Sequence, residues 1–150
     1  MRRVLTISVL AAALQFGTPA IAEEKPAQVE LWKSPSCGCC TGWMKHMQAA
    51  GYAVKSHDVA LGVLAKIKRQ AGLAPELHSC HTAKVGGYVI EGHVPAEDVA
   101  RLLSEKPNAV GLAVPAMPLG SPGMDFGPDK EAYDVLLVKK DGSTEVFAKR

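Results

Sequence analysis

The chain has 150 residues, and its 17 lysines and arginines against 15 aspartates and glutamates give a formal net charge of +2. A chain of this length forms one domain by default and can bury a hydrophobic core without disulfide bonds. The sequence carries neither the basic stripe of a nucleic-acid-binding protein nor a polybasic segment for lipid. We therefore expect no nucleic acid and no charged membrane surface as partners, and the four cysteines are not needed to hold the fold.

Residues 1–22 have the pattern of a secretory signal peptide. Arg2 and Arg3 precede a short apolar run, which ends in an Ala-Ile-Ala cleavage site at Ala22. The run is interrupted by polar and helix-breaking residues, and it is too short for a membrane span, which needs roughly 20 apolar residues. We predict cleavage after Ala22. The single domain of residues 23–150 then has 15 basic and 15 acidic residues and no membrane span.

The first half of this domain is predicted to alternate strands and helices. Residues 29–34 alternate apolar and polar side chains, which indicates a strand, and a turn rich in cysteine follows it. Residues 40–51 have helical periodicity and end at a glycine. Residues 52–59 predict a second strand, and residues 61–72 predict a second helix that also ends at a glycine. Residues 73–87 show little periodicity and are predicted to form a loop.

The second half is predicted to contain one more strand and helix, a long loop and a hairpin. Residues 88–92 indicate a short strand, and a proline in the first turn favours a helix over residues 95–106. Residues 111–130 are rich in proline and glycine and predict a loop, which at this length is usually functional or disordered. The dipeptide Asp141-Gly142 lies between two apolar-rich runs, and this predicts a β-hairpin over residues 133–147.

Three of the four cysteines, Cys37, Cys39 and Cys40, lie within four positions. Cys37 and Cys40 form a Cys-x-x-Cys pair at a helix N-terminus, where free N–H groups and the helix dipole favour thiolate. That position suits metal binding and redox chemistry equally. Disulfide exchange needs only two thiols, so Cys39 and the distant Cys80 are in excess of what it requires. Clustered thiolates favour Cu(I), and also zinc, and they can bridge more than one Cu(I) ion.

The order strand, Cys-x-x-Cys turn, helix, strand is how a thioredoxin-like fold begins. We therefore predict an α/β protein with a central mixed sheet flanked by helices and a C-terminal β-hairpin. In such a fold the loop before the third core strand faces the cysteine turn, which would bring Cys80 over it. His81 beside Cys80, together with Met117 and Met124 in the long loop, are further candidates as ligands or as a lid.

Three segments resemble a known family of proteins. They are SPSCGCCTGWMKHMQAAGY, SCHTAKVGGYVIEGHVPAEDVARLL and GLAVPAMPLGSPGMD. In this order they resemble a family of exported, thioredoxin-like metal-binding proteins that includes the copper-resistance protein CopG of Gram-negative bacteria. The resemblance covers roughly residues 29 to 126, and it does not extend clearly to the C-terminal hairpin.

This resemblance implies a thioredoxin-like fold, a periplasmic location and copper held by cysteine thiolates. The Cys-x-Cys-Cys motif of the family falls on Cys37, Cys39 and Cys40. Its Ser-Cys-His motif falls on Ser79, Cys80 and His81. It also implies a role in copper tolerance that can include interconversion of Cu(I) and Cu(II). Whether the protein is an enzyme, as a copper oxidoreductase would be, is left open.

The leading hypothesis is a periplasmic copper-binding protein that holds one or more Cu(I) ions through Cys37, Cys39, Cys40 and Cys80. Its expected partners are copper ions, other periplasmic copper-handling proteins, and an electron donor or acceptor. Two alternatives remain at this point. One is a thiol–disulfide oxidoreductase that uses Cys37 and Cys40, and the other is a binding module with a structural zinc ion.

Overall fold

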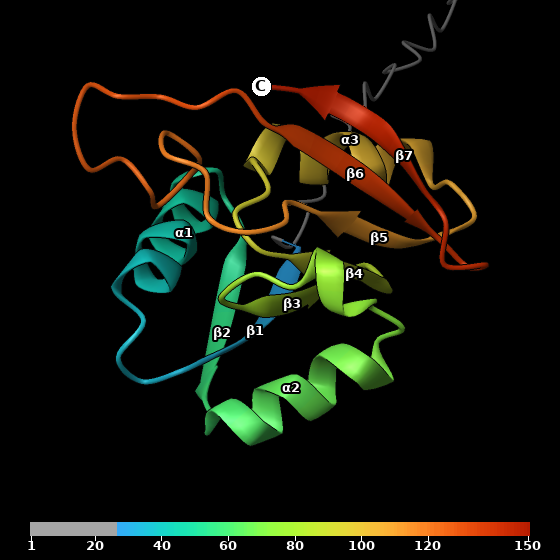
Figure 1. The fold of residues 1–150 in the computed structure, drawn as a ribbon, viewed down its shortest axis with the longest axis horizontal. Helices are drawn as coiled ribbons and strands as arrows, with labels where there is room; N and C mark the ends of the chain where they lie inside the picture. Colours follow the sequence, from blue (N-terminus) through green and yellow to red (C-terminus); the bar gives the residue numbers. More distant parts are fainter. Residues whose placement is uncertain (1–26) are drawn as a thin grey trace, which may run out of the picture.

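The computed structural model describes residues 27–150, so the predicted signal peptide and the first four residues of the predicted domain lie outside the described residues. Within this range the chain forms strands, three α-helices and a short 3-10 helix, coloured along the chain in Figure 1. The strands are β1 (Gln28–Lys33), β2 (Ala53–Asp58), β3 (Thr82–Val85), β4 (Tyr88–Glu91), β5 (Ala109–Ala113), β6 (Asp134–Lys139) and β7 (Thr144–Lys149). The helices are α1 (Gly38–Ala49), α2 (Leu61–Gln70), the 3-10 helix η1 (Pro75–Leu77) and α3 (Ala96–Glu105).

The strands form a seven-stranded sheet in the order β2-β1-β3-β4-β5-β6-β7 (Figure 1). The pairs β1–β2 and β4–β5 are parallel, and the other neighbouring pairs are antiparallel. The prediction of a mixed sheet with helices is therefore confirmed. The predicted hairpin around Asp141-Gly142 is formed by β6 and β7.

Two strands lie where the sequence predicted loops, and these predictions were wrong. β3 occurs within residues 73–87, and its four residues are too few to display a clear period of two. β5 overlaps the start of residues 111–130. Most positions of β5 are buried, because the sheet is covered on both faces there, and this removes the alternation that marks a half-exposed strand.

Both faces of the sheet carry a hydrophobic core. On one face, Trp43 of α1 and Leu102 of α3 pack against strand residues such as Ile90. On the other face, Leu77 of η1 packs with Val89 of β4 in a smaller cluster. Alternate residues of β4 therefore face opposite layers, as the pleat of a strand requires.

Strand direction brings several connecting segments to one end of the sheet. Trp32, near the end of β1, pairs with Thr82 at the start of β3, and Thr82 in turn pairs with Glu91 at the end of β4. β5 runs parallel to β4 and ends beside Glu91 at Ala113. The cysteine turn after β1, the Ser-Cys-His segment before β3, the segment after β4 and the long loop after β5 consequently meet at this end.

Candidate metal centre

The four cysteine sulfurs gather at the N-terminus of α1. Sγ of Cys39 lies 3.5 Å from Sγ of Cys37 and 3.7 Å from Sγ of Cys80. The Sγ atoms of Cys37, Cys39, Cys40 and Cys80 all lie within 4.8 Å of one another. Sulfurs this close can contact the same metal ion, or neighbouring ions, without a large rearrangement of the backbone.

Cys37 is the N-cap residue of α1, and its sulfur accepts the backbone N–H of Cys40 at 3.3 Å. The predicted position of the Cys-x-x-Cys pair at a helix N-terminus is thus observed. Cys37 and Cys40 are joined in a disulfide with a Cα–Cα distance of 5.4 Å, whereas Cys39 and Cys80 are free thiols. A disulfide must be reduced before both of its sulfurs can act as thiolate ligands.

The thiol of Cys80 is protonated in the metal-free protein. Burial, followed by the charge of the neighbouring Cys39 sulfur, raises the pKa of Cys80 to about 12. A bound cation reverses this effect, because metal binding displaces the thiol proton. Cys80 is therefore a protonated thiol without a metal, and a bound cation would favour its thiolate form.

His93 presents a nitrogen lone pair to Cys80. Its Nδ1 lies 2.8 Å from the carbonyl oxygen of Pro122, which can only accept, so Nδ1 carries the proton. Nε2 is then the acceptor of the neutral ring, and it lies 2.9 Å from Sγ of Cys80. Burial lowers the pKa of His93, and the ring stays neutral at pH 7. A neutral imidazole is the form that binds metals.

His81 is fully buried next to the same sulfur. Its ring packs on Trp43 with centroids 4.6 Å apart, and its Nδ1 lies 3.4 Å from Sγ of Cys80. Burial, then the charges of His93 and Lys68, lower the pKa of His81 well below its usual value. Its Nε2 is buried without a hydrogen-bond partner among the described residues. The nitrogen that lies next to the Cys80 sulfur is Nδ1, and a neutral imidazole in this place can coordinate a metal.

Donor atoms of Cys80, His81 and His93 lie within 4.8 Å of one another, so the sulfur cluster has an imidazole side. The sequence predicted His81 as a candidate but did not single out His93, because a histidine before a helix start is typical of a cap. The local signal is Gly92, which has a φ of +71°. A Cβ at Gly92 would lie 2.5 Å from the carbonyl oxygen of Val114, so only glycine turns the chain here and aims His93 at the cluster.

The loop between β5 and β6 extends beside α1, as Figure 1 shows. At Gly123, which has a φ of +86°, an added Cβ would lie 2.5 Å from the carbonyl oxygen of Cys39 and 2.5 Å from the backbone nitrogen of Trp43. The carbonyl oxygen of Pro122, the preceding residue, accepts a hydrogen bond from Nδ1 of His93. The loop therefore rests directly on the first turns of α1 and orders one histidine of the site.

Gly123→Ala is expected to destabilise the protein more than Gly142→Ala does. Both glycines have nearly the same φ, +86° and +85°, but nothing lies within 4 Å of a Cβ at Gly142. Each variant loses roughly 1–2 kcal/mol to the left-handed backbone, and only Gly123→Ala also forces the loop away from α1. Urea unfolding of both variants measures the difference in their free energies of unfolding. Equal losses would show that the close contact between the loop and α1 does not contribute to stability.

The two candidate methionines occupy different surroundings. Met124 is 9% exposed and follows Gly123 in the turn that packs on α1. Met117 is 48% exposed and lines a pocket of about 360 Å³ together with Glu131 and Tyr133. Met124 is thus held near the start of α1, whereas Met117 faces this pocket, and a ligand role for either stays a prediction.

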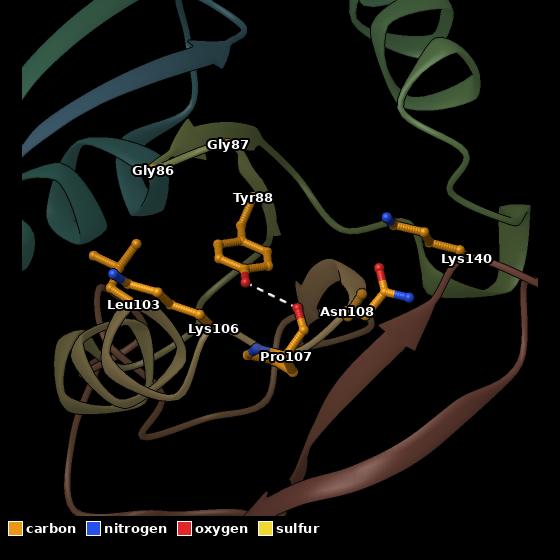
Figure 2. Close-up of a pocket in the computed structure, with 9 residues that line it drawn as sticks. Gly86, Gly87, Tyr88, Leu103, Lys106, Pro107, Asn108 and Lys140 are labelled. Carbon is orange, nitrogen blue, oxygen red and sulfur yellow. Dashed lines mark hydrogen bonds between the residues drawn. The ribbon is translucent and has the colours of Figure 1, made fainter.

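A larger pocket of about 500 Å³ lies elsewhere, between the β3–β4 turn, the end of α3 and the β6–β7 turn. Figure 2 shows Lys106 and Lys140 at this pocket, and Tyr88 donating its hydroxyl proton to the carbonyl oxygen of Pro107 at 2.8 Å. No cysteine or histidine lines it. The clusters of described residues that could hold a metal ion therefore lie at the end of the sheet near α1 and not in this pocket.

The fold and the site together define a small mixed α/β protein with a cluster of cysteines and histidines that could hold a metal ion. The family described as "Protein of unknown function, DUF411" matches residues 77–124. Two solved structures of the copper resistance protein CopG are 38% identical to this chain. Each match covers 83% of this chain and 98% of the CopG chain. Their TM-scores are 0.79 for form 2 and 0.78 for form 1. No curated protein sequence matches this chain significantly.

The chain belongs to the family of the copper resistance protein CopG. The match covers 83% of this chain and 98% of the CopG chains, and the family model over residues 77–124 includes the segment that carries Cys80 and His81. The predicted family membership is therefore confirmed.

Proposed function

We propose that the protein is a copper-binding protein of copper resistance that holds Cu(I) through Cys37, Cys39, Cys40 and Cys80. The main observation in support is that four cysteine sulfurs, from two segments distant in the sequence, lie within 4.8 Å of one another. Membership of the CopG family supports copper as the metal. Thiolates are soft ligands that favour Cu(I), and their capacity to bridge supports more than one ion per chain.

His81 complements the sulfurs in this proposal, with His93 beside it. Burial lowers the pKa of both rings and favours their neutral form, and each ring has a nitrogen next to the Cys80 sulfur, so both can bind copper. Met124 and Met117 are further soft donors in the loop that covers α1. Imidazole suits Cu(II) and thiolate suits Cu(I), so a mixed set supports interconversion of the two oxidation states.

The proposed location is the periplasm, reached through the signal peptide predicted over residues 1–22. Within residues 27–150 no helix is long and apolar enough to cross a membrane. The proposed partners are other periplasmic copper-handling proteins and an electron donor or acceptor. A reducing partner is needed in that compartment, because the Cys37–Cys40 disulfide must open before copper can bind to both sulfurs.

We also propose that the first four strands form a thioredoxin-like unit. The parallel pair β1–β2 is connected by α1, and a Cys-x-x-Cys pair begins this helix. Cys80 stands opposite that pair in the segment before β3, which is where such a fold places its third strand. β5, β6 and β7 extend the sheet beyond this unit.

An anaerobic Cu(I) titration of the reduced protein against a chromophoric competitor tests the proposed function, with free thiols counted at each step. Tight uptake of one or more Cu(I) ions, with all four thiols protected together, is the expected result. Weak uptake, with Cys37 and Cys40 reoxidising readily, would reject it. Tight zinc binding without Cu(I) binding would instead favour a structural zinc module.

A second candidate is a thiol–disulfide oxidoreductase, which the Cys37–Cys40 disulfide itself favours. Cys37 is partly exposed and Cys40 is fully buried, as an attacking and a resolving thiol would be. This function predicts turnover of a disulfide substrate without metal. Cys37→Ser should then abolish turnover while Cys39→Ser stays active, whereas the copper site requires both residues.

A further inference from the structure

A buried ion pair lies next to the metal centre, outside the set of proposed ligands. Lys68 of α2 is 4% exposed and Glu91 of β4 is 0% exposed, and their charged groups are in direct contact. Replacing a buried ion pair by apolar residues of similar volume often leaves the free energy of unfolding unchanged or raises it. Stability alone therefore does not explain two charged groups at this place.

The Glu91 carboxylate anchors both ends of the segment Ser79–Thr82. One oxygen accepts the backbone N–H of Ser79 at 2.7 Å, and the other accepts the hydroxyl of Thr82 at 2.6 Å. Thr82 and Glu91 are also partners in the β3–β4 ladder, but the Ser79 contact lies beyond that ladder and requires the carboxylate itself. Cys80 and His81 are the two residues between the anchors.

Lys68 supports this arrangement in two ways. Its ammonium group contacts the Glu91 carboxylate, and it donates a hydrogen bond to the Thr82 hydroxyl oxygen at 3.0 Å. It therefore joins α2 to the anchored segment. It also balances the charge of Glu91, so that the anchor adds no net negative charge beside thiolates that must ionise to bind a metal.

We propose that Glu91, with its charge balanced by Lys68, is a positioning residue of the metal centre. It fixes Cys80 and His81 opposite the cysteine turn, and this inference rests on the proposed function. Metal ligands must be held within about 0.5 Å of their productive geometry. Outer residues that orient ligands typically account for about 10–100-fold in metal affinity.

The double variant Lys68→Met/Glu91→Met tests the inference, because it removes both charges and both acceptor oxygens while nearly preserving side-chain volume. The Cu(I) affinity of the reduced protein is expected to fall about 10–100-fold. Alkylation of Cys80 by iodoacetamide in the metal-free reduced protein is expected to become faster, since the segment is no longer held in its buried place. The free energy of unfolding is expected to fall, because the Ser79 N–H and the buried Thr82 hydroxyl lose their acceptors.

Two further variants separate positioning from a purely structural role. Lys68→Met/Glu91→Gln again offers an oxygen to the Ser79 N–H and should restore most of the affinity and the slow alkylation. Asp98→Asn is the matched control, because Asp98 is also a buried carboxylate, paired with Arg150 and not with the cluster. It should lower stability without changing Cu(I) affinity or Cys80 reactivity.

Unchanged affinity and unchanged Cys80 alkylation in the folded Met/Met variant would overturn the inference. If that variant does not fold, Thr82→Val removes one anchor alone and should lower the affinity several-fold, as the loss of one hydrogen bond does. No change in that variant would then overturn it. Failure of the unaltered protein to bind Cu(I) would reject the proposed function instead, and the alkylation rates would still decide whether Glu91 holds the segment.

Discussion

Cys39→Ser and Cys80→Ser are each expected to weaken Cu(I) binding by at least about 100-fold. Loss of a residue that only orients a metal ligand already lowers affinity by about 10–100-fold, and these changes remove a proposed ligand itself. Cys39 lies between the other sulfurs, 3.5 Å from Cys37 and 3.7 Å from Cys80. Its replacement removes the sulfur that contacts both Cys37 and Cys80. Competition titration with a Cu(I) chelator measures affinity and stoichiometry together.

Neither substitution should disturb the fold. Cys39 and Cys80 are free thiols, and serine is smaller than cysteine only by the difference between sulfur and oxygen. Ser36→Ala is the matched control, because Ser36 is an exposed residue of the same turn. It should bind Cu(I) like the unaltered protein. Full stoichiometry and affinity in both cysteine variants would show that the cluster is not the copper site.

Trp43→Ala is expected to lower the free energy of unfolding by about 3–5 kcal/mol, the usual loss for a large aromatic side chain in a core. Trp43 is fully buried, and its indole N–H donates to the carbonyl oxygen of Val94 at 2.8 Å. The ring also packs on His81. Its removal therefore leaves a cavity between α1 and the imidazole side of the metal centre.

Urea unfolding followed by circular dichroism measures this loss, with the Cys37–Cys40 disulfide kept in one redox state. Trp43→Phe should lose less, about 1–3 kcal/mol, since it keeps a ring and gives up the hydrogen bond to Val94. Trp32→Ala is the control, because Trp32 is only partly buried and stacks on His57. Equal losses for Trp43→Ala and Trp32→Ala would contradict the packing argument.

Local patterns were sufficient for most of the helices and for the hairpin. The helix predicted over residues 40–51 is α1, and the turn at Asp141-Gly142 joins β6 to β7. Both depend on residues that are close in the chain. β3 and β5 were missed because one is very short and the other is buried on both faces. What identifies them as strands is the pairing with partners far along the chain.

The three clustered cysteines and their place at a helix N-terminus were determined by the sequence alone, since four consecutive positions in one turn cannot separate in space. Cys80 could be placed opposite them only through the expected fold. His93, Glu91 and Gly123 belong to the site for a different reason: strand order and direction bring the ends of β1, β4 and β5 and the start of β3 together. Such non-local pairing leaves no periodic mark in the sequence, so the imidazole side of the centre and its buried support were decided by the tertiary structure.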